Sequence, residues 1–275
     1  MSESAKREDR PSNAAKYFGD EAKALREALG LSQGGFADQL HYKQSQVSKV
    51  ESGAVLASAP FAEAMDRVAG TPGVYARLRA TLSKRGVPDW FAPYLDLESE
   101  AEQIEDFCTS LLMGILQTTQ YAEGTFKAVH PRSTDEHIRT LVDARLHRRD
   151  VMERESPPLL WVIMHEAALR TVVGDRTVMA AQMHHLAEAA SSPHITLQVL
   201  RFKAGAPASS SPFTLLTPDE GATVLYSETR EQGHVSDSVT AVGSARAAYE
   251  RLRAAASPPD ESVALFRSLA EEYTT

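Results

Sequence analysis

Apolar residues in the first third of the chain recur at helical spacing in short segments. Those of one stretch are Leu31, Phe36, Ala37, Leu40, Val47 and Val50. They fall on two segments broken at residues 41–43, so we predict two short helices that share one small core. Ser32 can cap the first helix with its hydroxyl, and Gly53 follows the second, where a left-handed residue is usual.

The same periodicity predicts three more helices around this hairpin, at Tyr17–Leu29, Ala59–Val68 and Val74–Leu82. Residues 1–12 are polar and are expected to be disordered. The Gly86–Asp89 segment marks the expected end of this region. We therefore predict a disordered tail over residues 1–12, a five-helix domain over residues 13–86 and a second domain over residues 87–275.

The pattern after residue 87 mixes helical and strand segments. Helical spacing predicts helices at residues 99–116, 119–129, 133–155, 167–190 with a break near Gly174, 238–255 and 259–273. Residues 133–136, with the sequence STDE, are expected to form a capping box that begins at Ser133 and starts the helix over residues 133–155. Runs of β-branched and aromatic residues predict strands at residues 159–164, 195–202, 213–217 and 223–226. The expected fold class is an all-α N-terminal five-helix domain followed by an α+β domain with a small sheet of four or five strands.

Composition places the chain among ordinary globular proteins, with 43% hydrophobic and 24% charged residues in a length of 275. It has no run of about 18 apolar residues, and its charged N-terminus lacks a hydrophobic signal region. We therefore expect the protein to stay in the cytoplasm. The one cysteine, Cys108, stands in an apolar run and is expected to be a buried small hydrophobic residue.

Charge is distributed unevenly along the chain, whose net charge is −8. Residues 1–86 contain 13 basic and 10 acidic side chains, which gives +3, whereas residues 87–275 contain 16 and 27, which gives −11. Only the N-terminal part therefore suits a polyanion such as DNA. Its modest charge favours site-directed recognition through few phosphate contacts over nonspecific coating.

The second helix of the hairpin offers a polar face that suits a DNA major groove. If Val47 and Val50 point inward, the opposite side near the helix start carries Gln44, Ser45, Ser48 and Lys49. A glutamine amide can pair with adenine N6 and N7, serine can contact bases or phosphates, and lysine neutralises phosphate. A purely structural pair of helices is the alternative interpretation.

The hairpin resembles the helix-turn-helix of the λ-repressor-like, or XRE, family of transcriptional regulators. The matching positions are Leu31, Ser32, Gln33, Phe36, Ala37, Ser45, Val47, Ser48, Glu51 and Gly53. The resemblance implies that Gln33 binds backbone phosphate and braces Gln44 against a base. The chain departs from the family at His41, which replaces the usual glycine and must accept a left-handed or strained conformation. It also departs at Lys43, which replaces the usual serine or threonine cap.

We therefore predict a sequence-specific DNA-binding transcriptional regulator whose reading helix spans Gln44–Ser52. The predicted DNA-binding residues are Gln33, Lys43, Gln44, Ser45, Gln46, Ser48 and Lys49. One such helix covers only a few base pairs and two-fold pairing doubles the contacts, so we predict a homodimer. A candidate interface, which can equally pack on its own sheet, is the apolar stripe of Val239, Val242, Ala245, Ala248, Tyr249 and Leu252.

The C-terminal part resembles the uncharacterised domain that follows an XRE-type helix-turn-helix in many actinobacterial regulators. The resemblance covers roughly residues 87–273 and is carried by segments such as LLMGILQTTQYAEGTF, PPLLWVIMHEAALRTVVG and SPFTLL. It implies transcription control and a small partner protein, because such regulators are often encoded beside one and are described as antitoxin-like. Operator DNA, a second copy of the chain and this small protein are thus the expected partners.

The C-terminal part lacks the sequence motifs of an enzyme. The pair His165–Glu166 is not followed by the second histidine of a zinc protease motif, and nucleophile-elbow, P-loop and paired-cysteine motifs are absent. His184 and His185 point about 100° apart on a helix, so only one of them can face Glu188. Glu166 and Arg170 are more simply a helical ion pair. We predict no catalytic activity, no cofactor and no metal.

Two functions of the second domain stay open at this point. The domain either dimerises and docks a partner protein, or it holds a small apolar molecule that switches the DNA reader. A continuous exposed apolar patch favours the partner protein. The ligand is favoured by a pocket lined by Trp161, Phe202, Phe213 and Tyr226.

Overall fold

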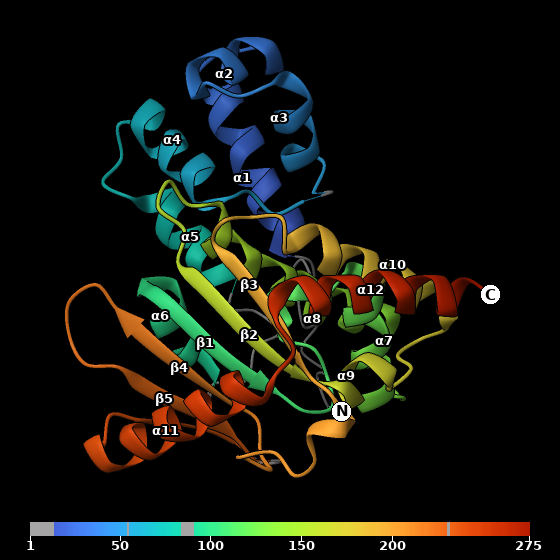
Figure 1. Cartoon of the computed structure of the whole chain (residues 1–275). Coiled ribbons are helices and arrows are strands. Elements are labelled where there is room, and N and C mark those ends of the chain that lie inside the picture. The colour runs from blue at the N-terminus through green and yellow to red at the C-terminus, as the bar shows by residue number, and fades with distance from the viewer. Residues whose placement is uncertain (1–13, 54, 84–90, 230–231) are drawn as a thin grey trace, which may run out of the picture. The chain divides into compact units, whose positions relative to one another are not determined.

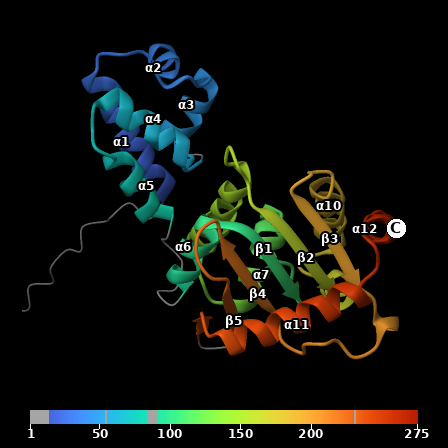
Figure 2. The same cartoon turned by 60° about the vertical axis from the view of Figure 1, so that its left-hand side comes forward.

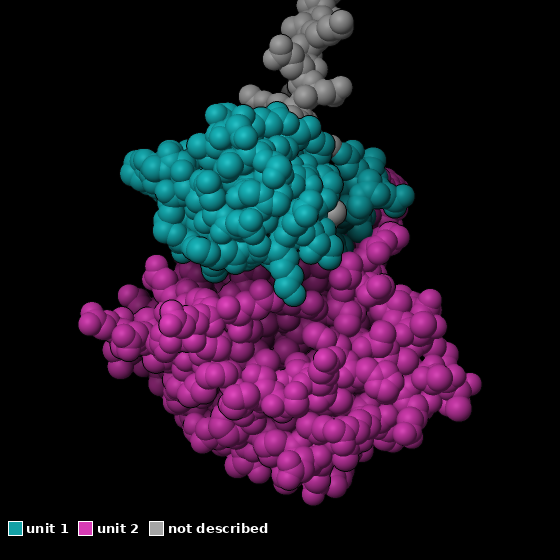
Figure 3. Space-filling model, turned by 90° about the horizontal axis from the view of Figure 1, so that it is seen from above, with its two compact units in different colours: residues 1–86, 133–144 teal, residues 87–132, 145–275 magenta. Residues whose placement is uncertain are grey.

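The structure of the protein is a computed structural model that describes residues 14–53, 55–83, 91–229 and 232–275 (Figure 1). The predicted tail over residues 1–12 and the predicted boundary at residues 86–89 lie outside the described residues. The chain divides into two compact units, residues 1–86 with 133–144 and residues 87–132 with 145–275, which Figure 3 colours separately.

The N-terminal region is helical, as predicted. Its five helices are α1 (Ala14–Ala28), α2 (Gln33–Leu40), α3 (Gln44–Glu51), α4 (Ala59–Ala69) and α5 (Val74–Ser83). The apolar residues predicted for the hairpin share one buried core with Phe18 and Phe61, except that Leu31 is only partly buried. The periodicity of the sequence therefore identified both the helices and the faces on which they pack.

Local signals at the ends of α2 and α3 behave as predicted. The hydroxyl of Ser32 accepts a hydrogen bond from the backbone N–H of Gly35 at 3.1 Å, and Gly53 has a φ of +72°. His41 adopts the left-handed conformation with φ 62° and ψ 40°, and it is the one non-glycine residue with positive φ among the described residues. Lys43 precedes α3 without a capping hydrogen bond from its side chain.

The C-terminal region is built on one mixed sheet of six strands in the order β3-β2-β1-β4-β5-β6. The strands β1, β2 and β3 are parallel, and β4, β5 and β6 continue the sheet in antiparallel pairs. Their bounds are β1 (Ala101–Cys108), β2 (Leu159–His165), β3 (Ile195–Leu200), β4 (Phe213–Pro218), β5 (Val224–Glu228) and β6 (Gly233–Ser236). The predicted α+β class is confirmed, with more strands than expected.

Helices cover both faces of this sheet. One face packs under α10 and α12, and the other is crossed by α11 (Figure 1, Figure 2). The α-helices of the region are α6 (Ala92–Glu100), α7 (Thr119–Val129), α9 (Glu166–Arg170), α10 (Arg176–Ala189), α11 (Val239–Ala255) and α12 (Pro259–Thr274). Between α7 and α9 the chain also forms α8 (Asp135–Leu146), most of which groups with the first unit. Short 3-10 turns are η2 (Gly114–Leu116), η3 (His147–Glu153) and η4 (Phe202–Ala204).

The largest error of the sequence analysis concerns residues 99–116, which were predicted to be helical. The helix α6 ends at Glu100, and the next eight residues form β1, a central strand of the sheet. Ile104 faces the core under α10 and α12, whereas Phe107 faces the core under α11. A strand buried on both faces lacks alternation of apolar and polar residues, so periodicity cannot distinguish it from a buried helix.

Smaller corrections to the prediction concern the strand β6 at the edge of the sheet and the two ends of α8. The strand β6 was missed because it has only four residues and a polar composition. Thr134, rather than Ser133, accepts the capping hydrogen bond of α8, from His137 N–H at 3.2 Å. This helix ends at Leu146 and continues as the 3-10 turn η3, whereas one helix to residue 155 was predicted. The predicted break near Gly174 is confirmed.

The apolar stripe of α11 belongs to the core of its own domain. Ala248, Tyr249 and Leu252 are buried against Phe213 and Leu215 of the sheet. The Tyr249 hydroxyl also donates a hydrogen bond to the backbone carbonyl of Trp161 at 2.7 Å. Of the predicted stripe, Val239 is the strongly exposed member, at 88%. The stripe is therefore occupied by internal packing and does not form the predicted interface between subunits.

The four aromatic residues whose gathering around one pocket would favour a small apolar ligand do not gather. Trp161 and Phe213 belong to the cluster under α11, whereas Tyr226 belongs to the cluster on the opposite face of the sheet. Phe202 is 54% exposed and contacts His165 edge to face. The pleat of the sheet sends alternate side chains to opposite faces, so these aromatic residues do not form the pocket that would favour a ligand.

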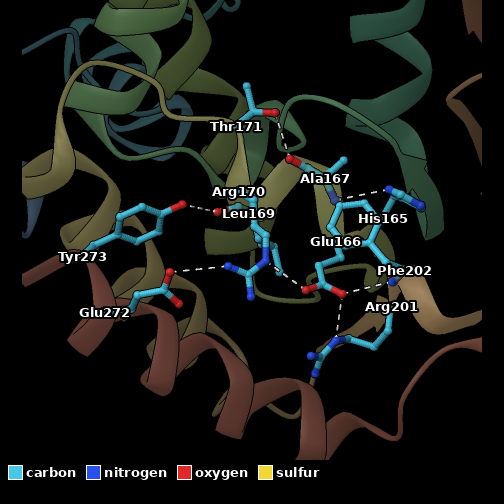
Figure 4. A network of polar contacts seen from close by, with 10 residues as sticks. All are labelled: His165, Glu166, Ala167, Leu169, Arg170, Thr171, Arg201, Phe202, Glu272 and Tyr273. Atoms are coloured by element: carbon cyan, nitrogen blue, oxygen red, sulfur yellow. Dashed lines mark hydrogen bonds and ion pairs between the residues drawn. The ribbon is translucent and has the colours of Figure 1, made fainter.

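A buried carboxylate holds together the carboxyl ends of β2 and β3 (Figure 4). Glu166 accepts hydrogen bonds from Arg170 Nε at 2.9 Å, Arg201 Nε at 2.9 Å and Phe202 N–H at 3.0 Å. Arg170 also reaches Glu272 of α12 at 3.5 Å. Burial by itself raises the pKa of Glu166, but these donors outweigh it and the pKa lies below its usual value. The predicted ion pair is confirmed, as part of a larger network.

Candidate nucleic-acid interface

The exposed side of α3 carries hydrogen-bonding side chains. Val47 and Val50 are 0% and 1% exposed and point into the core, as the sequence predicted. The residues exposed on and just before α3 are Lys43, Gln44, Ser45, Gln46, Ser48 and Lys49. None of these six is acidic, and the one acidic residue of the helix, Glu51, is buried. The face can therefore donate hydrogen bonds without repelling phosphate.

The start of α3 lies beside the start of α2. A Cβ atom placed on Gly34 would stand 3.9 Å from the amide Oε1 of Gln44. Gln33 is the first residue of α2 and is partly buried. The structure thus places Gln44 beside Gly34 in the first turn of α2, and Gly34 follows Gln33 in the sequence. The amide of Gln33 itself donates to Glu51, so the bracing of Gln44 by Gln33 stays a prediction.

An ion pair inside the domain fixes α3 relative to α1 and α2. Arg26 of α1 donates to the Glu51 carboxylate from Nε at 2.6 Å and from Nη2 at 3.1 Å. Gln33 Nε2 donates to the same carboxylate at 2.8 Å, and Arg26 Nη1 donates to the Leu31 carbonyl at 3.0 Å. One carboxylate therefore joins the end of α3 to both preceding helices through bidentate, charge-assisted contacts.

The hydrogen bonds between Arg26 and Glu51 keep both side chains ionised. Burial by itself raises the pKa of Glu51, but hydrogen bonds from Arg26 and Gln33 outweigh it, so the pKa lies below the ordinary value of 4.5. The hydrogen bond to Glu51 raises the pKa of Arg26. The negative charge at the end of α3 is consequently neutralised inside the domain and is not presented to a nucleic acid.

Close packing of α1 on α3 depends on one glycine. A side chain at Gly19 would collide with the backbone carbonyl of Val50, so only glycine permits this approach. The helix α5 is held by Asp66 of α4, which accepts hydrogen bonds from the backbone N–H groups of Tyr75 at 3.0 Å and Ala76 at 2.9 Å. These contacts make the five helices a rigid support for the exposed face.

Sequence reasoning missed the pair that orients α3. Glu51 was noted only as a matching position of the family, and Arg26 was not singled out. The partners are 25 residues apart, and a helical pattern does not reveal which distant side chain meets a buried acid. The one available signal was an acidic residue at the end of a helix whose other polar residues are donors.

The described ranges of the chain contain no group of three or more histidine, cysteine, aspartate or glutamate side chains placed to hold a metal ion, so His184, His185 and Glu188 do not form such a group. Within the same ranges no helix combines the length and the hydropathy needed to cross a membrane.

Comparison with known families agrees with the geometry. Residues 18–81 match the family model of a helix-turn-helix domain, which together with the exposed face of α3 indicates a DNA-binding regulator. Residues 91–268 match the model described as a domain of unknown function (DUF5753), and the chain belongs to that family. Neither a curated protein nor a solved structure matches the chain.

Proposed function

We propose that the protein is a sequence-specific transcriptional regulator that reads the major groove of DNA with α3. The observation that carries the proposal is the exposed face of this helix, where six side chains offer amide, hydroxyl or ammonium donors and none is acidic. The buried pair of Arg26 and Glu51 supports it, because a helix that reads bases must keep its orientation.

The side chains of the face divide by chemistry into two roles. Gln44 reads a base, preferably adenine through N6 and N7, while Ser45 and Ser48 contact bases or nearby phosphates. Lys43 and Lys49 bind phosphates, and Gln33 contacts the backbone beside Gln44. Gln46 lies at the margin of the face and adds a polar contact there. The net charge of +3 on residues 1–86 suits this limited set of phosphate contacts.

We further propose that the regulator acts as a homodimer. A single reading helix covers few base pairs, and two copies on half-sites about 34 Å apart supply the specificity that one lacks. The C-terminal region, with its net charge of −11, is unsuited to DNA and serves dimerisation and the docking of a small partner protein, in the manner of an antitoxin, without catalysis of its own. The buried part of the α11 stripe, Ala248, Tyr249 and Leu252, packs on its own sheet and is not available for this interface.

The decisive experiment measures operator binding by Gln44→Ala after selection of a binding site from random DNA. We expect a loss of roughly 1 to 3 kcal/mol on the selected site and relaxed preference at one base pair. Gln120→Ala, which removes an exposed amide from α7, serves as the matched control and should bind as the parent does. Equal loss by Gln44→Ala on specific and random DNA would contradict base reading.

Lys49→Ala tests the phosphate contacts. It should weaken binding to all sequences alike and reduce the salt slope of log K by about one unit. An unchanged slope would show that Lys49 does not touch the backbone.

Sedimentation and footprinting of the full chain test the dimer. We expect a dimer that protects two half-sites related by two-fold symmetry. A monomer that protects one non-palindromic half-site would exclude it.

A further inference from the structure

Three arginines crowd the junction of α8 and η3 in the C-terminal region. Arg145, Arg148 and Arg149 are spaced three and four residues apart, which places their side chains on one side of the chain. Arg148 has a full counter-charge, because Glu98 accepts its Nε at 2.9 Å and its Nη2 at 2.7 Å. Both side chains of this pair are largely buried, at 10% and 3% exposure.

The other two arginines donate hydrogen bonds only to neutral acceptors among the described residues. Arg145 Nη1 donates to the amide Oε1 of Gln117 at 3.0 Å, and its guanidinium lies 4.6 Å from the centre of the Phe126 ring. Arg149 Nε donates to the Ile115 carbonyl at 3.2 Å, while its Nη2 is buried without a hydrogen-bond partner. Two guanidinium groups are therefore held in place without a hydrogen bond to a carboxylate.

This arrangement is unfavourable for the protein alone. Burial lowers the pKa of Arg145 to about 10, with a further contribution from Arg148, and burial lowers the pKa of Arg149 against a smaller opposite effect of Glu153. A buried charge without a bound counter-charge costs free energy, and like charges four residues apart repel. The excess positive charge is notable because residues 87–275 carry a net charge of −11.

The segment that faces these arginines is rigid. A Cβ atom on Gly114 would collide with the guanidinium of Arg148 and stand 2.8 Å from Cδ of Arg145, so the backbone passes directly against them. Gln117 donates to the Leu112 carbonyl at 2.6 Å, and Gln182 of α10 donates to the Leu116 carbonyl at 2.7 Å. The backbone beside the two arginines is thus held in place by side-chain hydrogen bonds, so a ligand meets an ordered segment.

We propose that Arg145 and Arg149 bind a small oxyanion, the phosphate or carboxylate group of a low-molecular-weight ligand. Arg145 and Arg149 are both partly exposed residues, so an anion can approach their guanidinium groups from solvent, and a turn of the Arg149 side chain brings its covered Nη2 to the anion. A planar guanidinium matches either group through paired N–H donors, and Nη2 of Arg149 supplies a donor that the protein leaves unused. The site does not depend on the proposed DNA-binding function, since every contact that defines it lies in the C-terminal region.

His185 of α10 offers a local probe of this site. It is partly buried, and its pKa is lowered by burial and by the positive charge of Arg149, against a smaller opposite effect of Glu188. An anion beside Arg149 cancels part of that positive charge. Its binding should therefore raise the pKa of His185, which a proton NMR titration with and without inorganic phosphate measures, with His185→Asn to assign the resonance.

Thermal unfolding of the full chain provides the main test. Inorganic phosphate and acetate are compared with chloride at equal ionic strength, and the anion that raises the Tm identifies the preferred group. Arg149→Gln should lose this rise. Arg132→Gln, which removes an exposed arginine elsewhere, should retain it, and Lys49→Ala should also retain it and so exclude the DNA-binding face as its source.

Each outcome of the thermal unfolding experiment either supports or contradicts the proposed anion site. A rise in Tm that occurs only with phosphate or only with acetate, and that is lost in Arg149→Gln, supports the site and identifies the group that it binds. The proposal is overturned if neither anion exceeds chloride, or if Arg149→Gln responds as the parent does. If Arg149→Gln does not fold, Arg149→Lys keeps the charge without the planar group, and the His185 titration decides on the parent chain alone. Operator binding by Gln44→Ala is measured in a separate experiment, and its outcome does not depend on whether the anion binds.

Discussion

Both regions of the molecule bury carboxylates, and two of them, Glu51 and Asp106, are held in opposite ways. In the helical region Glu51 receives hydrogen bonds from two nitrogens of Arg26 and one of Gln33. In the α+β region Asp106 of β1 receives one, from the Thr214 hydroxyl at 2.7 Å, and its Oδ2 is buried without a partner. The number of donors, rather than burial itself, thus decides whether a buried acid stabilises its domain.

The two acids consequently make contributions to stability that depend on pH in opposite directions. The lowered pKa of Glu51 means that its contribution to stability is present above the ordinary pKa of 4.5 and is lost as the pH falls. Burial raises the pKa of Asp106 from 3.8 to about 7, against the lowering effects of Thr214 and Arg148. Its contribution is therefore fully present below pH 3.8 and is lost as the pH rises through about 7.

The largest expected effect comes from breaking the satisfied pair. Glu51→Leu leaves the Arg26 guanidinium, which is 12% exposed, without its counter-charge, and we expect the helical region to lose about 3 kcal/mol of stability. Thermal unfolding followed by circular dichroism measures the loss. The double variant Arg26→Met with Glu51→Leu removes both charges and should regain most of it. A loss below about 1 kcal/mol would mean that the pair behaves as a surface salt bridge.

Removing the charge of the unsatisfied acid should have a smaller effect of opposite sign. Asp106→Asn keeps the acceptor for Thr214 and should stabilise the α+β region by about 1 to 3 kcal/mol at pH 8, with little change at pH 5, where Asp106 is already protonated. Urea unfolding followed by tryptophan fluorescence reports on this region, because both tryptophans follow residue 86. Asp219→Asn, an exposed aspartate, is the matched control. Equal effects of Asp106→Asn at both pH values would contradict the raised pKa.

The smallest expected effect concerns strain within the helical region. His41 has a left-handed backbone conformation, which costs a non-glycine residue about 1 to 2 kcal/mol. Glycine avoids this cost but loses more conformational entropy on folding, which offsets part of the gain. His41→Gly should therefore stabilise this region by about 1 kcal/mol and leave operator preference unchanged. Thermal unfolding and the operator assay measure the two quantities. A destabilised variant would show that the imidazole makes a contact more valuable than the relief of strain.

Local chemistry in the sequence determined much of the N-terminal region. The spacing of Leu40, Val47 and Val50 predicted two helices and their buried faces. The resemblance to a helix-turn-helix, whose turn usually has a glycine at this position, implied the left-handed His41 that the structure contains. Such signals work because caps, turns and helix faces depend on residues a few positions apart. The exposed polar face of α3 follows from the same spacing, since it is the side opposite the two valines.

Contacts between distant residues were decided only by the tertiary structure. Arg26 meets Glu51 across 25 residues and Glu98 meets Arg148 across 50, and no local pattern marks either pair. The same holds for β1, whose burial on both faces removes the alternation that identifies a strand, and for the α11 stripe, whose apolar residues fit a second subunit or their own sheet equally well. Periodicity shows which side of an element avoids water, but only the packed chain shows what covers that side.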